Sequence, residues 1–283
     1  NNNGKQQNNN NNNSIGINYT LSNSETKSIS KHHTKKVRSQ SNHDYHEKHT
    51  LRRYGYKILK VIAVTLQGKV VRAVRKMDNQ VVVIKITNIK LHRQGVTIKN
   101  GKKIKVKENI LKEKKIMTKI QRQNPPKGFI DILHFFDDGV NYFLVMEDGG
   151  IDFFDYVVGM HDKIKEGLLS LKEWRKHVQI LFAQMCLFVQ FLHNINCCHL
   201  DISLENMLIK DVEFNESNGK FIKHGVVNFC DFGLAEFFDE NNVKTQIDKK
   251  NPFISKKYVG KTTYKAPKVY AKKYSFDARK ADV

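Results

Sequence analysis

Two short motifs hold side chains that could do chemistry together. The first reads H-x-D-x-x-x-x-N and supplies Asp201 and Asn206; the second is Asp231-Phe232-Gly233. A carboxylate such as Asp201 can accept the proton of an attacking hydroxyl, whereas the oxygens of Asn206 and Asp231 are ligands that suit Mg²⁺. A base and metal ligands in this order are typical of phosphoryl transfer from ATP, which depends mainly on positioning and charge neutralisation. The alternative is that Asp201 and Asp231 are ordinary solvated carboxylates.

Apolar runs beside the motifs predict the elements that position them. Residues 207–209 follow the first motif, residues 225–229 precede the second, and the turn-rich stretch 215–219 lies between them. Short apolar runs bounded by Asn, Ser and Gly are typical of strands joined by a turn. We therefore expect two strands between the motifs, which argues against a chance occurrence of both.

With these motifs the chain resembles the eukaryotic protein kinases, as a divergent serine/threonine type. The resemblance implies an α+β, two-lobed fold, with an antiparallel-sheet small lobe carrying one helix (residues 51–147) and a mainly helical, incomplete large lobe (residues 148–283). It also implies ATP and Mg²⁺ as cofactors and a protein as the phosphate acceptor. In the family the residue at Asp201 is the base, and those at Asn206 and Asp231 hold Mg²⁺.

The composition limits the class of protein. Hydrophobic residues make up 40% of the 283, which is enough for a core, and the formal net charge is +21. Residues 85–122 hold 13 Lys and Arg but only 2 Glu, so this stretch could attract nucleic acid or anionic lipid. The basic residues are not interleaved with exposed aromatics, as a base-stacking platform would need. We therefore favour solvated basic faces over a nucleic-acid site.

The cysteines and the apolar runs bear on location. Cys186, Cys197, Cys198 and Cys230 show no C-x-x-C spacing, and we interpret them as reduced thiols of an intracellular protein, cytoplasmic or nuclear. The most apolar run, residues 180–192, is shorter than the about 20 residues that cross a membrane, so we expect a core helix and no membrane span.

Residues 1–50 are rich in Asn, then in Ser, His and Lys, with almost no apolar periodicity. Such a segment buries too little surface to offset its ordering entropy, so we predict a disordered tail. An interaction or phosphorylation tail is the functional alternative.

Three apolar runs, residues 56–62, 68–74 and 81–86, predict strands. In the family a glycine-rich loop, G-x-G-x-x-G-x-V, joins the first two strands and covers the ATP phosphates. The glycine positions here are held by Ala63, Thr65 and Gly68, with Val70 in the valine position. Glycine lets the backbone approach phosphates closely, so the two replacements predict weaker nucleotide binding.

Lys85 ends the run V-V-I-K, which matches the family's V-A-I-K. The family's lysine contacts the α- and β-phosphates and pairs with a glutamate. A lysine at the end of an apolar strand needs a partner, because an unpaired buried charge is costly. Glu113 lies within the apolar stripe of a helix predicted over residues 108–121. We therefore predict an ion pair between Lys85 and Glu113, on either side of a long basic insertion over residues 91–107.

The resemblance also implies the walls of an adenine pocket. Residues 130–136 and 142–147 predict a hairpin, and Met146 at its end would be the gatekeeper, with ordinary core packing as the alternative. Residues 147–149 would be the hinge that bonds adenine, Asp152 could reach the ribose, and Val70, Val83 and Leu208 would sandwich adenine. The residues implied for ATP binding are Ala63, Gly68, Val70, Val83, Lys85, Met146, Glu147, Gly149, Asp152 and Leu208.

Residues 171–194 predict a long amphipathic helix. Apolar residues from Trp174 to Leu192, Val178 and Phe182 among them, recur every three or four positions. We expect these residues to face the core, and we expect the helix to lead directly into the segment that contains His199. For His199 we expect a structural role, because the family uses the aspartate two residues later as the base.

Departures from the family pattern bear on mechanism. Leu200 replaces the arginine that usually receives an activation-loop phosphate, so a switch through it is not expected. Ser203 replaces the lysine that steadies the γ-phosphate, and Lys261 stands where G-T-x-x-Y-x-A-P-E has threonine. We hypothesise that Lys261 supplies the cation missing at position 203, in which case Lys261→Ala cuts turnover by orders of magnitude and leaves ATP affinity nearly intact. A solvated loop lysine is the alternative.

Lys268 replaces the glutamate of A-P-E, and the match ends at Asp282-Val283, where the family continues with further helices. An incomplete lobe would expose apolar helix surface, which predicts poor solubility or a partner that covers it. The sequence favours an ATP-dependent protein serine/threonine kinase. One alternative is a pseudokinase that serves as a scaffold, supported by the missing glycines and Lys268; another is nucleic-acid binding through residues 85–122.

Overall fold

The computed structural model describes residues 46–99, 102–106, 109–238, 254–255, 258, 260–271 and 275–283. Up to residue 45, the predicted disordered tail lies outside the described residues. Residues 46–53 are helical, with Thr50 and Leu51 buried, so the disorder predicted for residues 46–50 is wrong. Leu51 packs in the core of the first sheet, and this burial offsets the entropy cost of ordering the helix.

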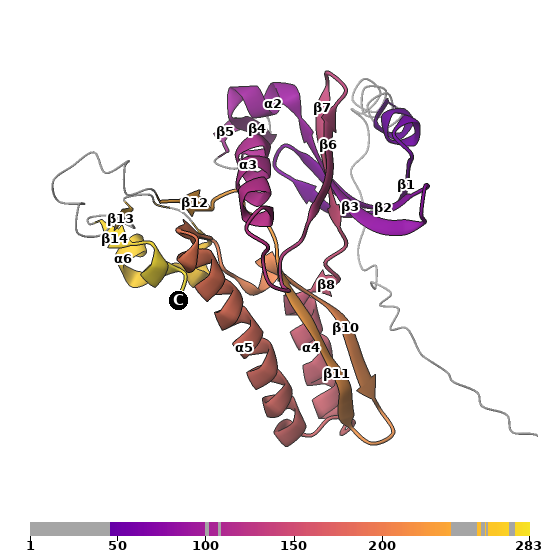
Figure 1. Ribbon diagram of the computed structural model, residues 1–283, viewed down its shortest axis with the longest axis vertical. Helices are drawn as coiled ribbons and strands as arrows, with labels where there is room; N and C mark the ends of the chain where they lie inside the picture. The colour runs from indigo at the N-terminus through magenta and orange to yellow at the C-terminus, as the bar shows by residue number, and fades with distance from the viewer. Residues whose placement is uncertain are drawn as a thin grey trace, which may run out of the picture. The chain divides into compact units, whose positions relative to one another are not determined.

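The first part of the described chain forms an antiparallel sheet in the order β1-β2-β3-β7-β6 (Figure 1). Its strands are β1 (Tyr56–Thr65), β2 (Gly68–Arg75), β3 (Gln80–Asn88), β6 (Ile132–Asp137) and β7 (Asn141–Glu147). Alternation along β3 buries Val82, Ile84 and Ile86 on one face. The predicted strands are confirmed, with ends that shift by no more than three residues.

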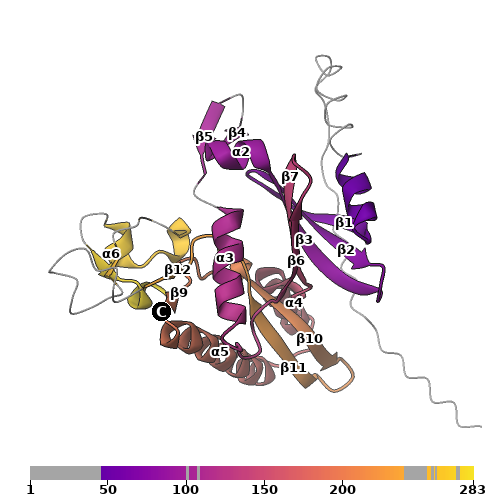
Figure 2. The ribbon, with the colours of Figure 1, turned by 45° about the horizontal axis from the view of Figure 1, so that its top comes forward.

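The basic insertion lies between β3 and the helix that carries Glu113. It folds as α2 (Ile89–Gln94), followed by a small hairpin of β4 (Val96–Lys99) and β5 (Lys102–Lys105). Asn88 caps the start of α2, and Gly95 ends it in the left-handed conformation at φ 61°. α3 (Ile110–Gln121) follows, with Asn109 as its cap (Figure 2).

Longer helices and a second sheet follow the first sheet. The helices are α4 (Phe153–Lys165) and α5 (Leu171–Asn194), and β8 (Ile151–Asp152), β10 (Met207–Asn215) and β11 (Lys220–Phe229) form a sheet in the order β11-β10-β8. Figure 1 shows α4 and α5 running alongside the β10–β11 hairpin. The prediction for α5 is confirmed at both ends, whereas α4 was not predicted.

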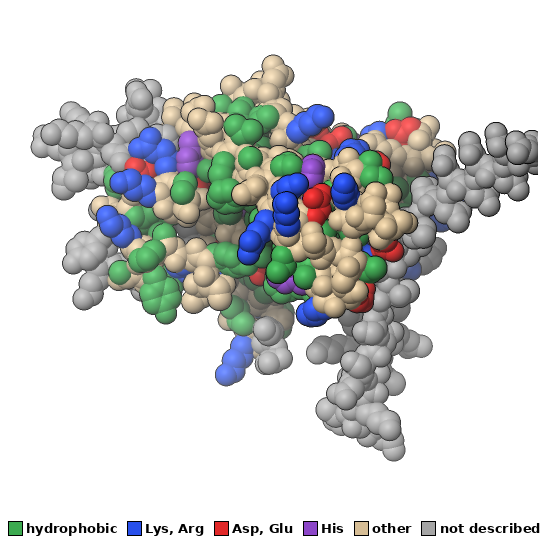
Figure 3. Space-filling view, turned by 90° about the horizontal axis from the view of Figure 1, so that it is seen from below, with side chains coloured by type: hydrophobic (Ala, Val, Ile, Leu, Met, Phe, Trp, Pro, Cys, Tyr) green, Lys and Arg blue, Asp and Glu red, His purple; other side chains and the backbone are tan. Residues whose placement is uncertain are grey.

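The buried stripe of α5 differs from the predicted one. It consists of Trp174, His177, Leu181, Phe188 and Leu192. Val178 and Phe182, predicted in the core, are exposed, Phe182 to 63%. Since one buried residue per turn covers only a narrow face, the apolar residues beside it remain at the surface. α5 thus carries exposed apolar surface, and hydrophobic side chains are also visible on the face of the molecule in Figure 3.

The last described segments return to the first motif. β9 (Cys197–Cys198) pairs with β12 (Glu236–Phe237), and β13 (Ile254–Ser255) pairs with β14 (Phe276–Asp277). Between β13 and β14 in sequence lies the short helix α6 (Pro267–Tyr270). Side chains of these segments form an apolar cluster that includes Cys198, Leu200, Val269 and Phe276.

An N-terminal antiparallel sheet followed by helices confirms the predicted α+β class. No helix in the described part of the chain combines the length and apolar character needed to cross a membrane.

Candidate active site

Lys85 and Glu113 form a buried ion pair. Lys85 lies on β3, paired with Val70 of β2 and Leu144 of β7, and its Nζ lies 2.7 Å from Oε2 of Glu113 on α3. The side chains are only 12% and 3% exposed. The structure thus brings together the pair predicted from helical periodicity. Because both groups leave water, each depends on the other for compensation of its charge.

Asp231 lies on the other side of the same ammonium. Its Oδ1 is 3.6 Å from Nζ of Lys85, and its backbone has a left-handed φ of 60°. Burial alone would raise the pKa of Asp231, but attraction to Lys85 and His199 and a hydrogen bond from Gly233 leave it below its ordinary value. Asp231 is therefore a stable anion.

Its neighbour Cys230 adds no charge to this part of the site. Burial raises the pKa of the Cys230 thiol to about 12. The thiol is therefore protonated at neutral pH and does not compete with Asp231 for a cation.

His199 has the surroundings of a structural residue. Its ring is fully buried, packs against Phe232 at 4.8 Å, and places Nε2 3.1 Å from the carbonyl oxygen of Cys230. These contacts tie the first motif to the second. The expected structural role for His199 fits this geometry.

Asp282 organises the backbone just before Asp201. Its carboxylate accepts hydrogen bonds from the N–H groups of His199 at 2.8 Å and Leu200 at 2.7 Å. Leu200 has a φ of 65°, which is strained for a branched side chain, so these bonds help to hold an unfavourable conformation. In the sequence, Asp282 matches the aspartate that opens the family's D-x-W-S-x-G, but no contact with His199 or Leu200 was predicted for it.

Asn206 orients the carboxylate of Asp201. Its Nδ2 donates to the backbone oxygen and to Oδ2 of Asp201, both at 2.8 Å. The 3-10 turn Leu204–Asn206 closes this small loop and leads into β10. Asn206 is therefore fixed by the residue proposed as the base.

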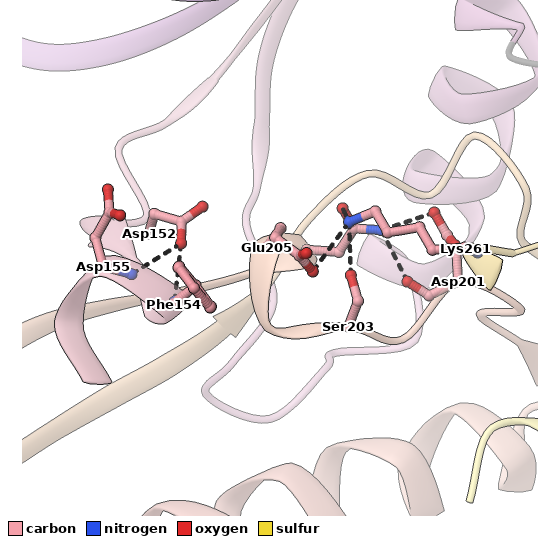
Figure 4. Close-up of polar contacts among 8 residues, drawn as sticks. Asp152, Phe154, Asp155, Asp201, Ser203, Glu205 and Lys261 are labelled. Carbon is pink, nitrogen blue, oxygen red and sulfur yellow. Dashed lines mark hydrogen bonds and ion pairs between the residues drawn. The ribbon is translucent and has the colours of Figure 1, made fainter. Parts of the chain in front are cut away.

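Lys261 meets this loop from a distant segment. Its backbone N–H donates to Oδ1 of Asp201 at 3.0 Å, and its Nζ donates to Oγ of Ser203 at 2.7 Å and to Oδ1 of Asn206 at 3.0 Å. Figure 4 shows the Lys261 side chain lying across the loop that carries Asp201 and Ser203. The predicted proximity of Ser203 and Lys261 is confirmed, whereas the role of Lys261 in turnover remains a prediction.

Glu205 completes the surroundings of the Lys261 ammonium and was missed from the sequence. Its Oε2 lies 3.3 Å from Nζ of Lys261. A hydrogen bond from its own backbone N–H lowers the pKa of Glu205 most, and Ser203 and Lys261 lower it further. Its place in the first motif was the available signal, but the motif leaves that position unspecified.

The predicted adenine-contacting residues lie on adjoining elements. Val83 pairs with Met146 across β3 and β7, and Leu208 pairs with Asp152 across β10 and β8. A Cβ on Gly149 would come within 2.7 Å of side-chain atoms of Leu208 and Ile130, so these elements lie close together at this glycine. The roles of Met146, Glu147 and Gly149 towards adenine remain predictions.

Asp152 caps α4. Its Oδ1 accepts from the N–H groups of Phe154 at 2.8 Å and Asp155 at 3.3 Å. Burial raises the pKa of Asp152 more than these hydrogen bonds lower it. The residue predicted for the ribose therefore has a structural function in addition.

The turn between β1 and β2 is anchored by Gln67. β1 runs through Ala63 to Thr65, and Gly68 begins β2. A Cβ on Gly68 would lie 1.9 Å from the carbonyl oxygen of Ile86, so only glycine fits there. The side chain of Gln67 is buried and donates to the carbonyl oxygens of Leu91 and Val96 in the insertion, at 3.1 and 3.0 Å. Nothing in the sequence pattern pointed to Gln67.

Arg72 joins the first sheet to the segment after β7. It lies on β2, two residues beyond Val70, and its guanidinium contacts both carboxylate oxygens of Asp148 at 3.0 and 3.1 Å. A further bond at 3.1 Å reaches the carbonyl oxygen of Gly150. Arg72 thus fixes the backbone around Gly149.

The donor set suits Mg²⁺ only in part. Asp231 is an anionic carboxylate of the kind that Mg²⁺ prefers, and its side chain is 34% exposed. The amide oxygen of Asn206, however, already accepts a hydrogen bond from the Lys261 ammonium. Asp231 therefore fits the metal role, the oxygen of Asn206 is shared with the ammonium of Lys261, and the metal roles of both residues remain predictions.

The protein kinase domain, as a family, matches residues 56–283 of the chain. The probable serine/threonine-protein kinase RTK1 of Saccharomyces cerevisiae is 29% identical over 157 residues, which cover 56% of this chain and 20% of that protein. The probable serine/threonine-protein kinase MARK-B of Dictyostelium discoideum is 29% identical over 163 residues, 56% of this chain and 19% of that protein. The serine/threonine-protein kinase dkf-2 of Caenorhabditis briggsae is 27% identical over 188 residues, 65% of this chain and 13% of that protein. The chain thus spans about a fifth or less of the length of these relatives.

Proposed function

Since the chain belongs to the protein kinase family, we propose that it transfers the γ-phosphoryl group of ATP to serine or threonine hydroxyls of proteins. The observation that carries this proposal is the position of Lys85, 2.7 Å from Glu113 and 3.6 Å from Asp231. An ammonium held between a helix carboxylate and a metal-binding carboxylate is what a phosphate clamp requires.

In the proposed reaction, the acceptor hydroxyl oxygen forms a bond to the γ-phosphorus while the bond from that phosphorus to the β–γ bridging oxygen breaks, and ADP leaves. Asp201 accepts the hydroxyl proton, with its carboxylate oriented by Asn206 and by the backbone of Lys261. Lys85 contacts the α- and β-phosphates, with Glu113 behind it. Mg²⁺ bound at Asp231 would neutralise charge on the phosphates.

A hollow next to Asp201 supports a protein acceptor. It lies between the first motif and the segment from Gly260 onwards, and its lining includes Leu200, Ile202, Tyr264, Ala266, Val269 and Phe276. Mostly apolar walls suit an extended peptide side chain beside the base. The choice of serine or threonine over tyrosine follows the relatives, which are named as serine/threonine-protein kinases.

A pseudokinase that serves as a scaffold is the second candidate. It is favoured by Ala63 and Thr65, which stand at glycine positions of the family pattern. Both residues are paired with β2 within β1, so their backbone is less free to approach phosphates. The retained set of Lys85, Glu113, Asp201 and Asp231 favours the enzyme. We also propose an intracellular location, cytoplasmic or nuclear, where ATP is available, and we give no role to nucleic-acid binding.

Asp201→Asn tests the proposal. The amide cannot accept the hydroxyl proton, so we expect phosphate transfer from radiolabelled ATP to a generic protein substrate to fall about 10²- to 10⁴-fold. Mg²⁺-dependent thermal stabilisation by ATP should remain, because Asp201 is not a phosphate ligand in this scheme. Asp162→Asn, an exposed residue of α4, is the matched control. ATP-dependent stabilisation with no transfer by the wild-type protein would favour the scaffold.

A further inference from the structure

The side-chain amide of Asn206 has its orientation fixed from both ends. Its nitrogen donates to the backbone oxygen and to Oδ2 of Asp201, each at 2.8 Å. Its oxygen accepts from Nζ of Lys261 at 3.0 Å. A flipped amide would set nitrogen against ammonium and oxygen against carboxylate, so the oxygen must face Lys261.

The ammonium of Lys261 is held in a built site. An ammonium has three N–H donors, and Ser203, Asn206 and Glu205 offer acceptor oxygens at 2.7, 3.0 and 3.3 Å. The backbone N–H of Lys261 is itself bonded to Asp201 at 3.0 Å, so the residue is anchored at its base as well as at its tip. Figure 4 shows this convergence on the loop that carries Asp201, Ser203 and Glu205.

A metal ion on the same amide oxygen would conflict with this ammonium. Mg²⁺ binds oxygen at about 2.1 Å, and the ammonium lies 3.0 Å from that oxygen. The two cations would then be within about 5 Å of one another, where like charges repel. In protein kinases generally, the residue at Asn206 binds the second of two Mg²⁺ ions, and the residue at Asp231 binds metal too.

We propose that Lys261 is a built-in cation that takes the place of the second metal ion, so that this chain binds its nucleotide with one divalent ion, held through Asp231. This inference rests on the proposed function, because it requires ATP to bind. It explains why a serine stands at position 203: a lysine there would crowd a second ammonium against the first. Ser203 instead supplies an acceptor to Lys261 at 2.7 Å.

Counting bound Mn²⁺ tests the inference without any turnover. Mn²⁺ and a non-hydrolysable ATP analogue are titrated into the purified chain, and free Mn²⁺ is measured by electron paramagnetic resonance. We expect one Mn²⁺ per bound nucleotide in the wild-type protein. We expect two in Lys261→Met, where the amide oxygen of Asn206 is released to a metal. Lys268→Met, an exposed lysine of α6, should keep one.

The Mn²⁺ count of Asn206→Ala is a second and independent test. The substitution should leave the count at one in the wild-type background and should remove the extra Mn²⁺ from Lys261→Met. Two Mn²⁺ in the wild-type protein, or loss of a metal on Asn206→Ala alone, overturns the inference even if Lys261→Met does not fold. A wild-type protein that binds no Mn²⁺–nucleotide contradicts the proposed function, and the inference with it.

Discussion

The mutual dependence of Lys85 and Glu113 gives a stability prediction. Glu113→Ala removes the carboxylate 2.7 Å from a nearly buried ammonium, and Asp231 lies further from that ammonium, at 3.6 Å. We expect the free energy of unfolding to fall by about 3 kcal/mol, the lower end for a broken buried pair. Urea denaturation of the purified variant measures this loss.

A double variant separates stability from function at the same pair. Lys85→Met with Glu113→Leu should recover most of the stability, since an apolar pair of similar volume carries no desolvation cost. It should bind no ATP. If the double variant is as unstable as Glu113→Ala, the loss comes from packing and not from the uncompensated charge.

His177 predicts how stability depends on pH. Its buried ring has Nε2 2.6 Å from the hydroxyl of Tyr156 and Nδ1 2.7 Å from Nδ1 of His224, and it stacks on Phe221. Burial, followed by repulsion from His224, lowers the pKa of His177 from 6.5 to about 3. The folded protein thus keeps this ring neutral at a pH where the unfolded chain protonates it.

The free energy of unfolding should therefore be constant above pH 6.5 and fall as the pH drops towards 3, at most by about 1.4 kcal/mol per unit. Thermal melts at pH 7.5 and 5 would show this as a lower Tm at pH 5. His177→Gln should flatten the difference, whereas His161→Gln, an exposed histidine on α4, should not. An unchanged slope in His177→Gln would mean that other groups titrate in this range.

At the residue scale, the sequence predicted those residues that stand out by their place in a helical period or in a motif. Glu113 could be found because a carboxylate within an apolar stripe needs a cation, and Lys261 because its motif position exchanged character with Ser203. Asp282 and Gln67 act through contacts between segments far apart in the chain, which local patterns do not record. The amide oxygen of Asn206, predicted to hold a metal, accepts a hydrogen bond from Lys261, a contact that the motif does not indicate.

Among the elements, the β1–β2 hairpin shows how the chain compensates for missing glycines. Its turn is bound to the basic insertion through the side chain of Gln67 and through Thr97, whose hydroxyl donates to the carbonyl oxygen of Leu66. A further bond at 2.8 Å, from the N–H of Asn88 at the end of β3 to the carbonyl oxygen of Gln67, holds the turn to the first sheet. Because these bonds restrain the turn, the hairpin does not need flexible glycines in order to be held in one position over a phosphate. The same restraint would prevent the hairpin from adjusting its backbone to a bound phosphate.

Gln67→Ala should release this hairpin. We expect amide hydrogen exchange in the strands that flank the turn to be faster by about thirtyfold. The substitution removes two hydrogen bonds that contribute about 1 kcal/mol each, or about 2 kcal/mol together. Mass-spectrometric exchange resolves the peptides concerned. Gln123→Ala, exposed in the turn after α3, is the matched control. Equal exchange in both variants would show that the insertion does not restrain the hairpin.

The elements were predicted best where one face is clearly buried. α5 and the strands have runs long enough for their period to be visible. α4 was missed because its apolar residues do not all lie on one face. Its buried face consists of Phe153, Tyr156 and Met160, but Phe154 and Val158 are also apolar and are exposed, so the helical period is hard to recognise. The signal that was available is Asp152, whose side chain caps the helix.

For the molecule as a whole, the ion pair between Arg72 and Asp148 joins residues far apart in the chain, and a similar ion pair joins residues close together. Both the Arg72–Asp148 pair and the Arg75–Asp78 pair are Arg–Asp ion pairs starting on β2, but the second joins residues three apart and has a more exposed carboxylate. Arg72→Ala should lower the free energy of unfolding by about 1–2 kcal/mol, because charge-assisted bonds to Asp148 and Gly150 are lost together.

Arg75→Ala should lower the free energy of unfolding clearly less than Arg72→Ala, as expected for a surface pair. Urea unfolding curves for the two variants measure the difference. Similar losses in both would mean that Arg72 adds no more than a local surface contact. At this scale the sequence predicted the class of fold, because patterns specify the elements; it did not reveal the Arg72 link, which depends on how the elements dock.

The hydrogen bonds from His199 and Leu200 to Asp282 span 83 and 82 residues. During synthesis on the ribosome, the base loop emerges long before its anchor, and closing so wide a chain segment is slow compared with forming helices and hairpins. Until then, the left-handed Leu200 lacks the carboxylate that holds it. We therefore expect the nascent protein to pass through a stage in which its scaffold is folded and Asp201 is still out of place, so that the loop around Asp201 becomes ordered only after Asp282 has emerged.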